Sequence, residues 1–439
     1  MRGAVPRQFL EPFRRANSMY QNLRMAHTVF FAAVIFSGQI AFGQEWTRFR
    51  GPDGKGVVEA TSLPAMVTKA DINWKTPLPG KGHSSPVLWG DRIFLQSGDP
   101  TSALRYLMCV SAKDGKVIWQ REFPSGTSKL HGRNSYGTST PTVDAERVYF
   151  TWASPSSLKL VAFSHDGKEQ WSRDFGPHKS EHGYGVSPII YENLVIMPNF
   201  QLGEKLAEGE APGVSSVIAV NKATGEVVWA TPRKSLSVTY SAACPVKLAD
   251  GRTEIVISSN SNGVFSLDPT TGKENWALNV FRKRPVSSPF VWQGLLFCTA
   301  GEGANGHLVA IQPGKDAKIV YQTETKAPYV PTPIGAGKHL YLWTDTGIVS
   351  CLNAEIGNVL WSSRLQASGN LNFSSSPVRA GDQIYNLTDE GRLLCIKANP
   401  TELEMLGEFD FAEECRATPA LAGGKLFVRT ISHLISIGK

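Results

Sequence analysis

The stretch Thr-Gly-Lys-Glu-Asn-Trp at residues 271–276 decides the fold, because versions of it recur along the sequence. In each version a Gly lies four residues before a Trp, and the versions end at Trp119, Trp171, Trp229, Trp276 and Trp361. A Gly at a fixed offset suits a turn in which φ becomes positive, and the Trp offers a large apolar surface for packing. The repeated stretch therefore predicts an array of β-hairpins.

A second signature precedes each turn: a small residue, usually Ser or Thr, is followed by Pro and by two short apolar runs. The prolines of this signature are Pro86, Pro141, Pro188, Pro245, Pro289, Pro333, Pro377 and Pro419. They span 333 residues in seven intervals, a mean period of about 48 residues, which falls in the range of four-stranded propeller blades. Because such a repeat takes precedence over a domain count from length, we expect one large domain.

The first unit illustrates the expected blade. Short apolar strands run from Pro86 to Trp89, from Arg92 to Leu95, from Arg105 to Val110 and from Val117 to Trp119, with polar segments between them. Two units depart from this pattern. Tyr321 takes the Trp position in the fifth unit, and the seventh unit keeps neither the Gly nor the Trp.

The eighth unit decides how the array ends. After Pro419 the chain has room for only three short strands before Lys439, and an orphan Ile-Asn-Trp-Lys-Thr around Trp74 stands upstream of the first unit. Pairing the Trp74 strand with the C-terminal strands would complete the last blade and remove exposed sheet edges. The sequence therefore predicts an all-β fold over residues 44–439: a single eight-bladed β-propeller of four-stranded antiparallel blades, closed by its N- and C-terminal strands.

The first 43 residues differ from the rest. Arg14, Arg15 and Arg24 precede an apolar run from Val29 to Ile40, and Ala-Phe-Gly follows at 41–43. This order predicts a secretory signal peptide over residues 1–43. The run of about 12 residues is shorter than the roughly 20 that span a bilayer. We expect export to the periplasm or to the extracellular space, with no transmembrane segment in the mature chain.

Charge and cysteine content narrow the function classes. The leader holds five Arg and one Glu, so the mature chain keeps only +3 of the formal net charge of +7, which gives no support for nucleic-acid binding. Of the six Cys, Cys109, Cys298, Cys351 and Cys395 lie in apolar runs, which predicts buried free thiols. No Cys lies near the cleavage site to carry a lipid, and no two Cys are adjacent.

The Trp-terminated turns and the Ser-Pro or Thr-Pro strands resemble the pyrroloquinoline-quinone-like (PQQ-like) propeller repeat over residues 45–439. That repeat occurs in quinoprotein dehydrogenases and in the propeller lipoprotein of the outer-membrane assembly machinery. The resemblance implies that the repeat tryptophans dock between blades as structural residues, namely Trp74, Trp119, Trp171, Trp229, Trp276 and Trp361.

The resemblance implies two alternative functions, that of a quinoprotein dehydrogenase and that of the assembly lipoprotein. The quinoprotein enzymes tend to have a vicinal Cys-Cys ring and acidic Ca²⁺ ligands with a catalytic Asp. This sequence has no Cys-Cys pair, and Asp and Glu are absent from most positions just ahead of the prolines. The assembly lipoprotein is the better parallel in architecture, although its lipid-bearing Cys is missing here.

The segments that enter the innermost strands are expected to open onto one end of the central channel, where ligands bind. Residues three to five positions before each Pro are therefore candidates for a ligand funnel: His83, Tyr136, Tyr184, Tyr240, Arg284, Tyr329, Phe373 and Arg416, with His131 and His182 slightly further out. Aromatic rings and Arg side chains suit a planar, anionic or sugar-like ligand. The alternative is that these side chains plug the channel and hold the blades in register.

Other motifs add little chemistry. His178 and His182 are four residues apart, which would suit Zn²⁺ on a helix, but their surroundings predict a solvated loop. No motif for nucleophilic, phosphoryl-transfer or redox-thiol chemistry occurs. The segment from Asn199 to Gly213 is the longest departure from the repeat and is expected to protrude from the third blade.

We therefore expect an exported, monomeric propeller that acts as a protein-interaction scaffold or binds a small molecule in the funnel, without catalytic residues, cofactor or metal. The alternative is a dehydrogenase of alcohols or sugars that depends on PQQ and Ca²⁺. The fold alone does not choose between them, because function resides in sites.

Overall fold

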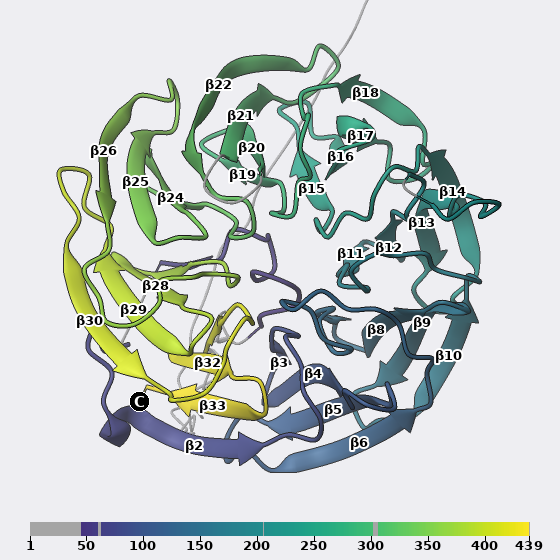
Figure 1. Cartoon of the computed structure of the whole chain (residues 1–439), viewed down its shortest axis with the longest axis horizontal. Coiled ribbons are helices and arrows are strands. Elements are labelled where there is room, and N and C mark those ends of the chain that lie inside the picture. Colours follow the sequence, from purple (N-terminus) through teal and green to yellow (C-terminus); the bar gives the residue numbers. More distant parts are fainter. Residues whose placement is uncertain (1–44, 60–62, 205, 302–305, 439) are drawn as a thin grey trace, which may run out of the picture. The chain divides into compact units, whose positions relative to one another are not determined.

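The strands form eight separate sheets arranged in a ring (Figure 1). The computed structural model describes residues 45–59, 63–204, 206–301 and 306–438, and the expected signal peptide lies outside them. Within these residues each sheet is antiparallel, apart from one added parallel strand, β1 (Val57–Val58), which pairs with β27. The eight-bladed β-propeller expected from the repeats is confirmed.

Blades 1 to 4 follow one another along the chain, each with its innermost strand first. Their strands are, in blade 1, β3 (Val87–Trp89), β4 (Arg92–Gly98), β5 (Arg105–Ser111) and β6 (Val117–Phe123); in blade 2, β7 (Thr142–Val143), β8 (Arg147–Ser154), β9 (Ser157–Ser164) and β10 (Glu169–Asp174); in blade 3, β11 (Ile189–Tyr191), β12 (Leu194–Asn199), β13 (Ser215–Asn221) and β14 (Val227–Arg233); in blade 4, β15 (Cys244–Lys247), β16 (Thr253–Ser259), β17 (Gly263–Leu267) and β18 (Glu274–Leu278).

Blades 5 to 7 repeat this order, and blade 8 combines the two ends of the described chain. Their strands are, in blade 5, β19 (Phe290–Trp292), β20 (Leu295–Ala300), β21 (Gly306–Gln312) and β22 (Lys318–Ala327); in blade 6, β23 (Ile334–Ala336), β24 (His339–Trp343), β25 (Ile348–Asn353) and β26 (Val359–Arg364); in blade 7, β27 (Val378–Ala380), β28 (Gln383–Leu387), β29 (Arg392–Lys397) and β30 (Met405–Asp410); in blade 8, β31 (Ala420–Ala422), β32 (Lys425–Arg429), β33 (His433–Ile437) and β2 (Ile72–Pro77), which follows the short 3-10 helix η1 (Lys69–Asp71).

Blade 8 closes the ring as the sequence predicts. Strand β2 is its outermost strand and pairs antiparallel with β33, with Trp74 opposite Ser436 and Lys75 opposite Ile435. The Trp74 ring lies 6.1 Å from the ring of Phe427 on β32. Because each blade now has a neighbour on both sides, no blade presents an open face to water at the junction of the ends.

Most repeat aromatic residues link one blade to the next. The indole N–H of Trp229 donates to the carbonyl of Pro269 in the turn of blade 4 at 2.9 Å, and its ring covers Gly272 of that turn. Gly272 has φ +68°, and a Cβ there would lie 2.6 Å from the Trp229 ring. The repeated Gly is therefore required both by the turn and by the ring that packs on it.

The same contact recurs at five other blade junctions. The indoles of Trp74, Trp119, Trp171 and Trp361 donate to turn carbonyls of the following blade at 3.3, 2.9, 3.0 and 3.0 Å, and the Tyr321 hydroxyl does so at 2.8 Å. Trp276 instead donates to Glu254 of its own blade at 2.8 Å. The following turn, in blade 5, lacks the repeat pattern and reads Gly-Lys-Asp at 314–316.

The segment of residues 46–58 crosses the centre of the ring (Figure 1, purple). Trp46 forms a β-bridge with Leu88 of blade 1, while the Arg50 guanidinium donates to carbonyl oxygens of Thr332 and Pro333 in blade 6 and of Pro377 in blade 7. Arg50 is buried, and burial lowers the pKa of its guanidinium to about 9. This segment links blade 1 to blades 6 and 7, and the sequence patterns did not predict its path.

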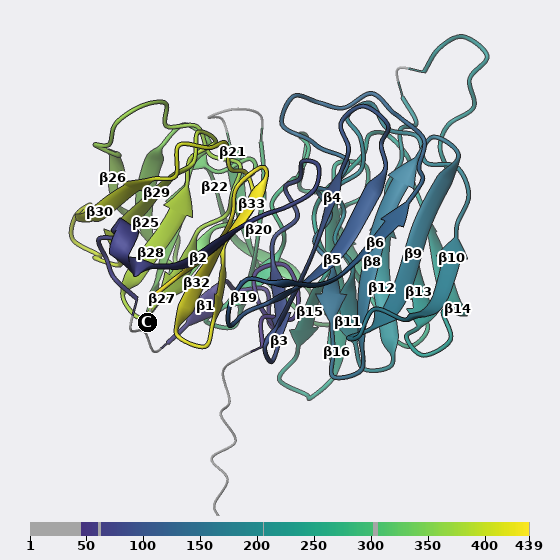
Figure 2. The ribbon, with the colours of Figure 1, turned by 90° about the horizontal axis from the view of Figure 1, so that it is seen from below.

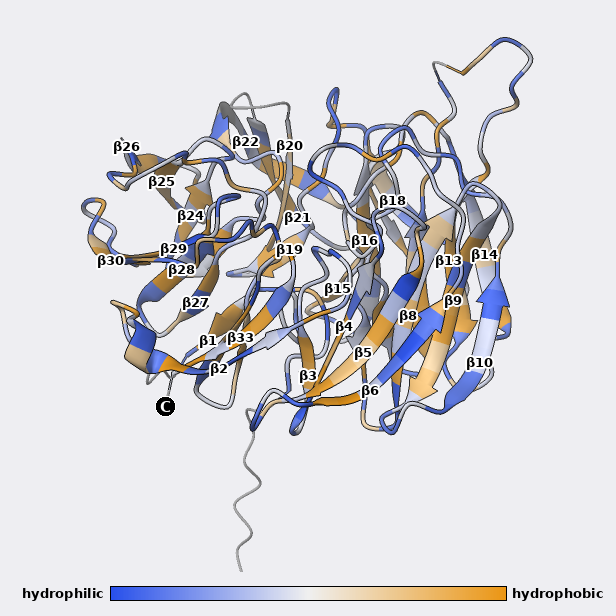
Figure 3. Cartoon of the chain, turned by 60° about the horizontal axis from the view of Figure 1, so that its bottom comes forward, coloured by the Kyte–Doolittle hydropathy of each residue, from blue (hydrophilic) through white to orange (hydrophobic). Residues whose placement is uncertain are grey.

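The core lies between the blades. Middle strands such as β4 and β12 are buried along nearly their whole length because both faces meet a neighbouring blade, whereas outer strands such as β10 carry more hydrophilic residues (Figure 3). All six cysteines are free and buried, which confirms the prediction of buried thiols. In blade 3 the chain between β12 and β13 projects as a long loop (Figure 2).

Candidate functional site

A cavity of about 240 Å³ lies at the centre of the ring and is lined by residues of all eight blades. The segments leading to the innermost strands are extended, so residues two positions apart face the same side and form two rows. We call the row nearer the strands the hydroxyl ring; its members are Ser85, Thr140, Ser187, Ala242, Ser288, Thr332, Ser376 and Thr418. The second row is His83, Thr138, Gly185, Tyr240, Val286, Val330, Ser374 and Arg416. Phe49, His131, Arg133, Asn134, His182, Arg284 and Tyr329 complete the wall.

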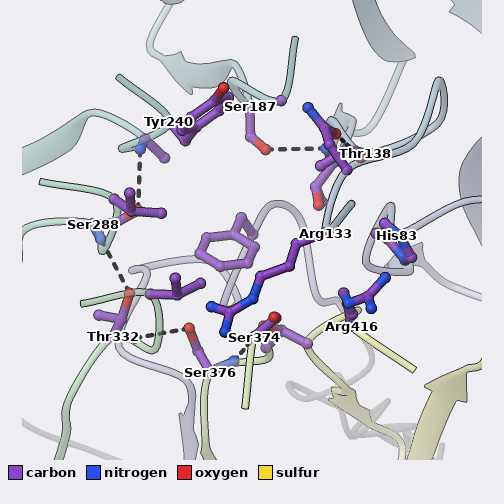
Figure 4. A pocket seen from close by; sticks show the side chains of 18 of the residues that line it. His83, Arg133, Thr138, Ser187, Tyr240, Ser288, Thr332, Ser374, Ser376 and Arg416 are labelled. Atoms are coloured by element: carbon purple, nitrogen blue, oxygen red, sulfur yellow. Dashed lines mark hydrogen bonds between the residues drawn. The ribbon is translucent and has the colours of Figure 1, made fainter. Parts of the chain in front are cut away.

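Hydrogen bonds run around the hydroxyl ring from blade to blade. Seven of its backbone N–H groups donate to the hydroxyl of the next blade at 2.9–3.1 Å, and the last of them, from Thr418 to Ser85, returns to blade 1 (Figure 4). The circuit is interrupted where Ala242 offers no oxygen to the N–H of Ser187. The Ser or Thr before seven of the eight prolines therefore joins neighbouring blades and also lines the cavity.

Arg284 and Arg416 reach the wall of the cavity from blades 5 and 8, which are three positions apart around the ring. Arg284 is hydrogen-bonded to Glu181, and Arg416 is bonded to Glu414 and, through Nε at 3.3 Å, to Asp389. These three carboxylates lie outside the wall and orient the guanidinium groups. An ion inside the cavity therefore meets N–H donors first.

Arg133 is held differently. Its Nη1 lies 3.5 Å from Oδ1 of Asp345, and its guanidinium donates no hydrogen bond to any described residue. The other oxygen of Asp345 accepts from the backbone N–H groups of Tyr329 at 2.9 Å and Val330 at 3.3 Å. Burial raises the pKa of Asp345. Arg133 projects into the cavity in Figure 4.

His83 lies beside Arg416 (Figure 4) and is almost fully buried. Burial lowers the pKa of its imidazole to about 3, with a further contribution from the positive charges of Arg416 and Arg429. The ring is therefore neutral at pH 7, when one nitrogen donates and the other accepts. Its Nδ1 is buried without a hydrogen-bond partner among the described residues.

The structure brings together five of the eight residues that the sequence suggests for the funnel: His83, Tyr240, Arg284, Tyr329 and Arg416 line the cavity. His131 and His182 also line it, with ring centroids 5.1 Å apart. Arg133, Phe49 and the hydroxyl ring were not among the candidates. The Ser or Thr before seven of the eight prolines was the available signal for the hydroxyl ring, whereas no local pattern marks Arg133 or Phe49.

Tyr136, Tyr184 and Phe373 do not line this cavity. Tyr184 and Phe373 lie three positions before a member of the hydroxyl ring, as does Tyr329, which lines the cavity, so this offset alone does not decide which way a side chain faces. Tyr184 is buried and borders a separate cavity of about 10 Å³, as does Tyr136, whose ring lies under the Arg105 guanidinium at 4.6 Å. Phe373 packs in the core against Trp343.

His178 is not part of a solvated loop as the sequence suggests. It is buried, with Nδ1 3.2 Å from the side-chain oxygen of Asn199 and its ring edge-on to Tyr184. Burial lowers the pKa of His178 to about 4. His182 points elsewhere, toward His131. His178 and His182 therefore lie in different environments and do not form a metal-binding pair.

The cavity does not fit a calcium-dependent quinone site. Ca²⁺ takes six to eight oxygen ligands, with carboxylates prominent among them. No Asp or Glu side chain lines this wall, which carries three Arg side chains that would repel a cation. In the described ranges no group of three or more His, Cys, Asp and Glu side chains could hold a metal ion.

The fold and the site define an eight-bladed propeller with a central cavity rich in hydrogen-bond donors. The chain belongs to the family described as outer membrane protein assembly factor BamB, whose model matches residues 74–208 and 213–437. The comparison with curated proteins gives no match.

Solved structures support the same fold. BamB from Moraxella catarrhalis is 13% identical, with a TM-score of 0.57 over 84% of this chain and 97% of its own. Quinohemoprotein alcohol dehydrogenase from Comamonas testosteroni is 11% identical, with a TM-score of 0.62 over 90% of this chain and 81% of its own. The computationally designed protein Ika8 is 9% identical, with a TM-score of 0.54 over 90% of this chain and 100% of its own.

Over the residues with described structure, no helix is long and apolar enough to cross a bilayer.

Proposed function

We propose that this chain is a ligand-binding propeller that takes a small anionic molecule into its central cavity. The observation that carries the proposal is the composition of the wall, which includes three Arg, three His, nine Ser or Thr and two Tyr side chains but no carboxylate. A ligand carboxylate or phosphate would find charge-assisted donors there, and Arg in particular binds such groups through two N–H bonds at once.

The carboxylates behind the wall do not cancel this preference. Glu181, Asp389 and Glu414 occupy part of the donor set of Arg284 and Arg416, and in doing so they fix the direction of each guanidinium. A preoriented donor loses less entropy when it binds a ligand than a mobile one. The arrangement therefore favours specific recognition through hydrogen bonds over a general attraction by net charge.

The hydroxyl ring supports the same conclusion. Its oxygens accept backbone N–H bonds from the neighbouring blade, so the O–H groups remain as donors. Tyr240 and Tyr329 add aromatic surface to the wall. A ligand with an apolar or planar body and anionic substituents uses all of these groups.

Calorimetry with phthalate and pyrophosphate tests the proposal, with phthalamide as an uncharged ligand of similar shape. We expect phthalate or pyrophosphate to bind and phthalamide to bind at least about tenfold more weakly, because hydrogen bonds to charged groups are worth about 1.5–3 kcal/mol. Arg284→Gln and Arg416→Gln should each weaken anion binding by a similar factor. Arg252→Gln removes an exposed arginine paired with Asp250 and serves as the control. If neither anion binds, or if Arg252→Gln weakens binding as much as the cavity variants, the proposal fails.

A scaffold role is a second candidate, favoured by apolar pairs on the outer strands. Val117 and Ile118, Val227 and Val228, Ile319 and Val320, and Val359 and Leu360 are each 40–52% exposed. They precede the repeat Trp or Tyr321, where a β-bulge occurs in each blade concerned. Exposed apolar groups of this kind suit a protein partner. Lys substitutions of the blade 5 and 6 pairs should abolish cross-linking to a partner in the native envelope fraction; unchanged cross-links would exclude these pairs.

We further infer that the protein is exported, on the strength of the leader pattern at residues 1–43. Fractionation of the source cells checks this. Recovery of uncleaved protein from the cytoplasm alone would contradict it.

A further inference from the structure

Arg133 and Asp345 meet across the central cavity. Arg133 belongs to the segment ahead of β7 in blade 2, and Asp345 follows β24 in blade 6. Blades 2 and 6 stand on opposite sides of a ring of eight (Figure 1). Their contact, 3.5 Å from Nη1 to Oδ1, therefore places the Arg133 side chain across the cavity rather than along its wall.

The two ends of this contact differ in freedom. Asp345 has a side chain only 2% exposed, and its Oδ2 is held by the N–H groups of Tyr329 and Val330. Its Oδ1 is buried and has no hydrogen-bond partner among the described residues. The carboxylate is thus a fixed anchor with one unused acceptor, which is costly to leave unpaired.

Arg133 is anchored only through its backbone. Its N–H donates to Nδ1 of His131 at 3.1 Å, and the N–H of His131 in turn donates to the carbonyl of His182 at 3.2 Å. The side chain is 40% exposed. Arg284 and Arg416, in contrast, are hydrogen-bonded to their carboxylates. Arg133 is therefore the guanidinium of the wall that is best able to change partner.

We propose that Arg133 is a gate over the cavity: without a ligand it lies across the opening on Asp345, and it exchanges Asp345 for the anionic group of a ligand that enters. This inference rests on the proposed anion binding. Arg133 then selects for a charged group at that position, because a neutral ligand cannot compete with the Asp345 carboxylate. The contact with Asp345 lowers the apparent affinity by the fraction of molecules in which the gate is closed.

Removal of the anchor gives a specific test with phthalate and pyrophosphate as probes. Asp345→Asn keeps an oxygen for the N–H groups of Tyr329 and Val330 but removes the negative charge. We expect it to tighten binding of the anion about fivefold, the amount that a partly exposed ion pair supplies. In an Arg133→Gln background the same substitution should change affinity less than about twofold, because no gate remains to be released.

Glu414→Gln is the matched control, since it removes from Arg416 a carboxylate that lies outside the cavity wall, while Asp389 still holds that guanidinium. Its effect should be the same with and without Arg133. If Asp345→Asn changes the affinity equally in the wild-type chain and in Arg133→Gln, the Asp345 charge acts through long-range electrostatic repulsion of the anion and not through Arg133. That result refutes the gate but leaves anion binding intact. If no probe binds the wild type or any variant, anion binding itself is refuted and the gate falls with it.

A crystal structure with phthalate gives a result that does not depend on folding of the Asp345 variant. The guanidinium of Arg133 is expected within hydrogen-bonding distance of a phthalate carboxylate and away from Asp345. A bound phthalate with Arg133 still on Asp345 would overturn the gate.

Discussion

Completing the hydroxyl ring should stabilise the propeller. Seven blade junctions have a backbone N–H donating to a Ser or Thr hydroxyl at 2.9–3.1 Å, and the eighth lacks the acceptor because Ala242 stands there. Ala242→Thr supplies the missing oxygen at a position where Thr140, Thr332 and Thr418 show the geometry. A net hydrogen bond is worth about 0.5–1.5 kcal/mol, so we expect about 1 kcal/mol of added stability.

The small size of this stabilisation determines which assay can detect it. For a propeller unit of roughly 400 residues, an unfolding entropy of about 2.1 cal/mol/K per residue gives about 0.8 kcal/mol/K, so 1 kcal/mol moves the melting temperature by only about 1 °C. Hydrogen exchange at the Ser187 amide is more sensitive, since 1 kcal/mol of local protection slows exchange about fivefold. Denaturation in urea provides the global free energy.

Ala242→Val is the matched control, because Val has the shape of Thr without the oxygen. We expect no slowing of exchange at Ser187 in this variant. Ser376→Ala removes an existing acceptor, 2.9 Å from the N–H of Thr332, and should speed exchange of the Thr332 amide. Equal exchange rates at Ser187 in the Thr and Val variants would refute the claim that the ring stabilises the blade junctions.

Two further predictions concern the His83 imidazole and the repeat turns. The pKa of His83 is about 3 in the folded chain and about 6.5 when unfolded, so the unfolded state binds the extra proton and stability falls by about 1.4 kcal/mol per pH unit below pH 6.5. His83→Gln should make urea denaturation midpoints less sensitive to pH between 6.5 and 4; an unchanged slope would mean that His83 titrates normally. Gly272→Ala should cost about 2–4 kcal/mol, because its Cβ would lie 2.6 Å from the Trp229 ring at φ +68°. Gly294→Ala, with φ +78° and no neighbour within 4 Å, should cost only about 1–2 kcal/mol; equal costs would show that ring contact is unimportant.

Much of the fold was predictable because its signals are local. The Gly four residues before each Trp marks a turn, and the interval between prolines sets the number of blades. The pairing of β2 with β33 was also predictable, because the last blade lacks one strand and the Trp74 strand at the other end of the propeller has no blade of its own. The hydrogen bond of Trp276 within its own blade was not predictable, because it depends on the altered turn of the neighbouring blade.

The candidate site was predictable only in part. Position relative to the prolines identified Tyr240, Arg284 and Arg416 as cavity residues but also selected Tyr184 and Phe373, which face the other way. Spacing along the chain does not separate the two groups, because Tyr184, Phe373 and the cavity residue Tyr329 each lie four positions before a Pro, so the direction of each side chain depends on the path of its segment in the folded ring.

Short-range patterns in the chain thus suffice for the blades, their number and the closure, because turn geometry and strand alternation depend on residues a few positions apart. The cavity is a property of the folded ring alone. Arg133 and Asp345 are far apart in the chain and become neighbours only because the ring puts blades 2 and 6 face to face. Likewise, Arg50 reaches blades 6 and 7 only because the N-terminal segment crosses the centre of the closed ring.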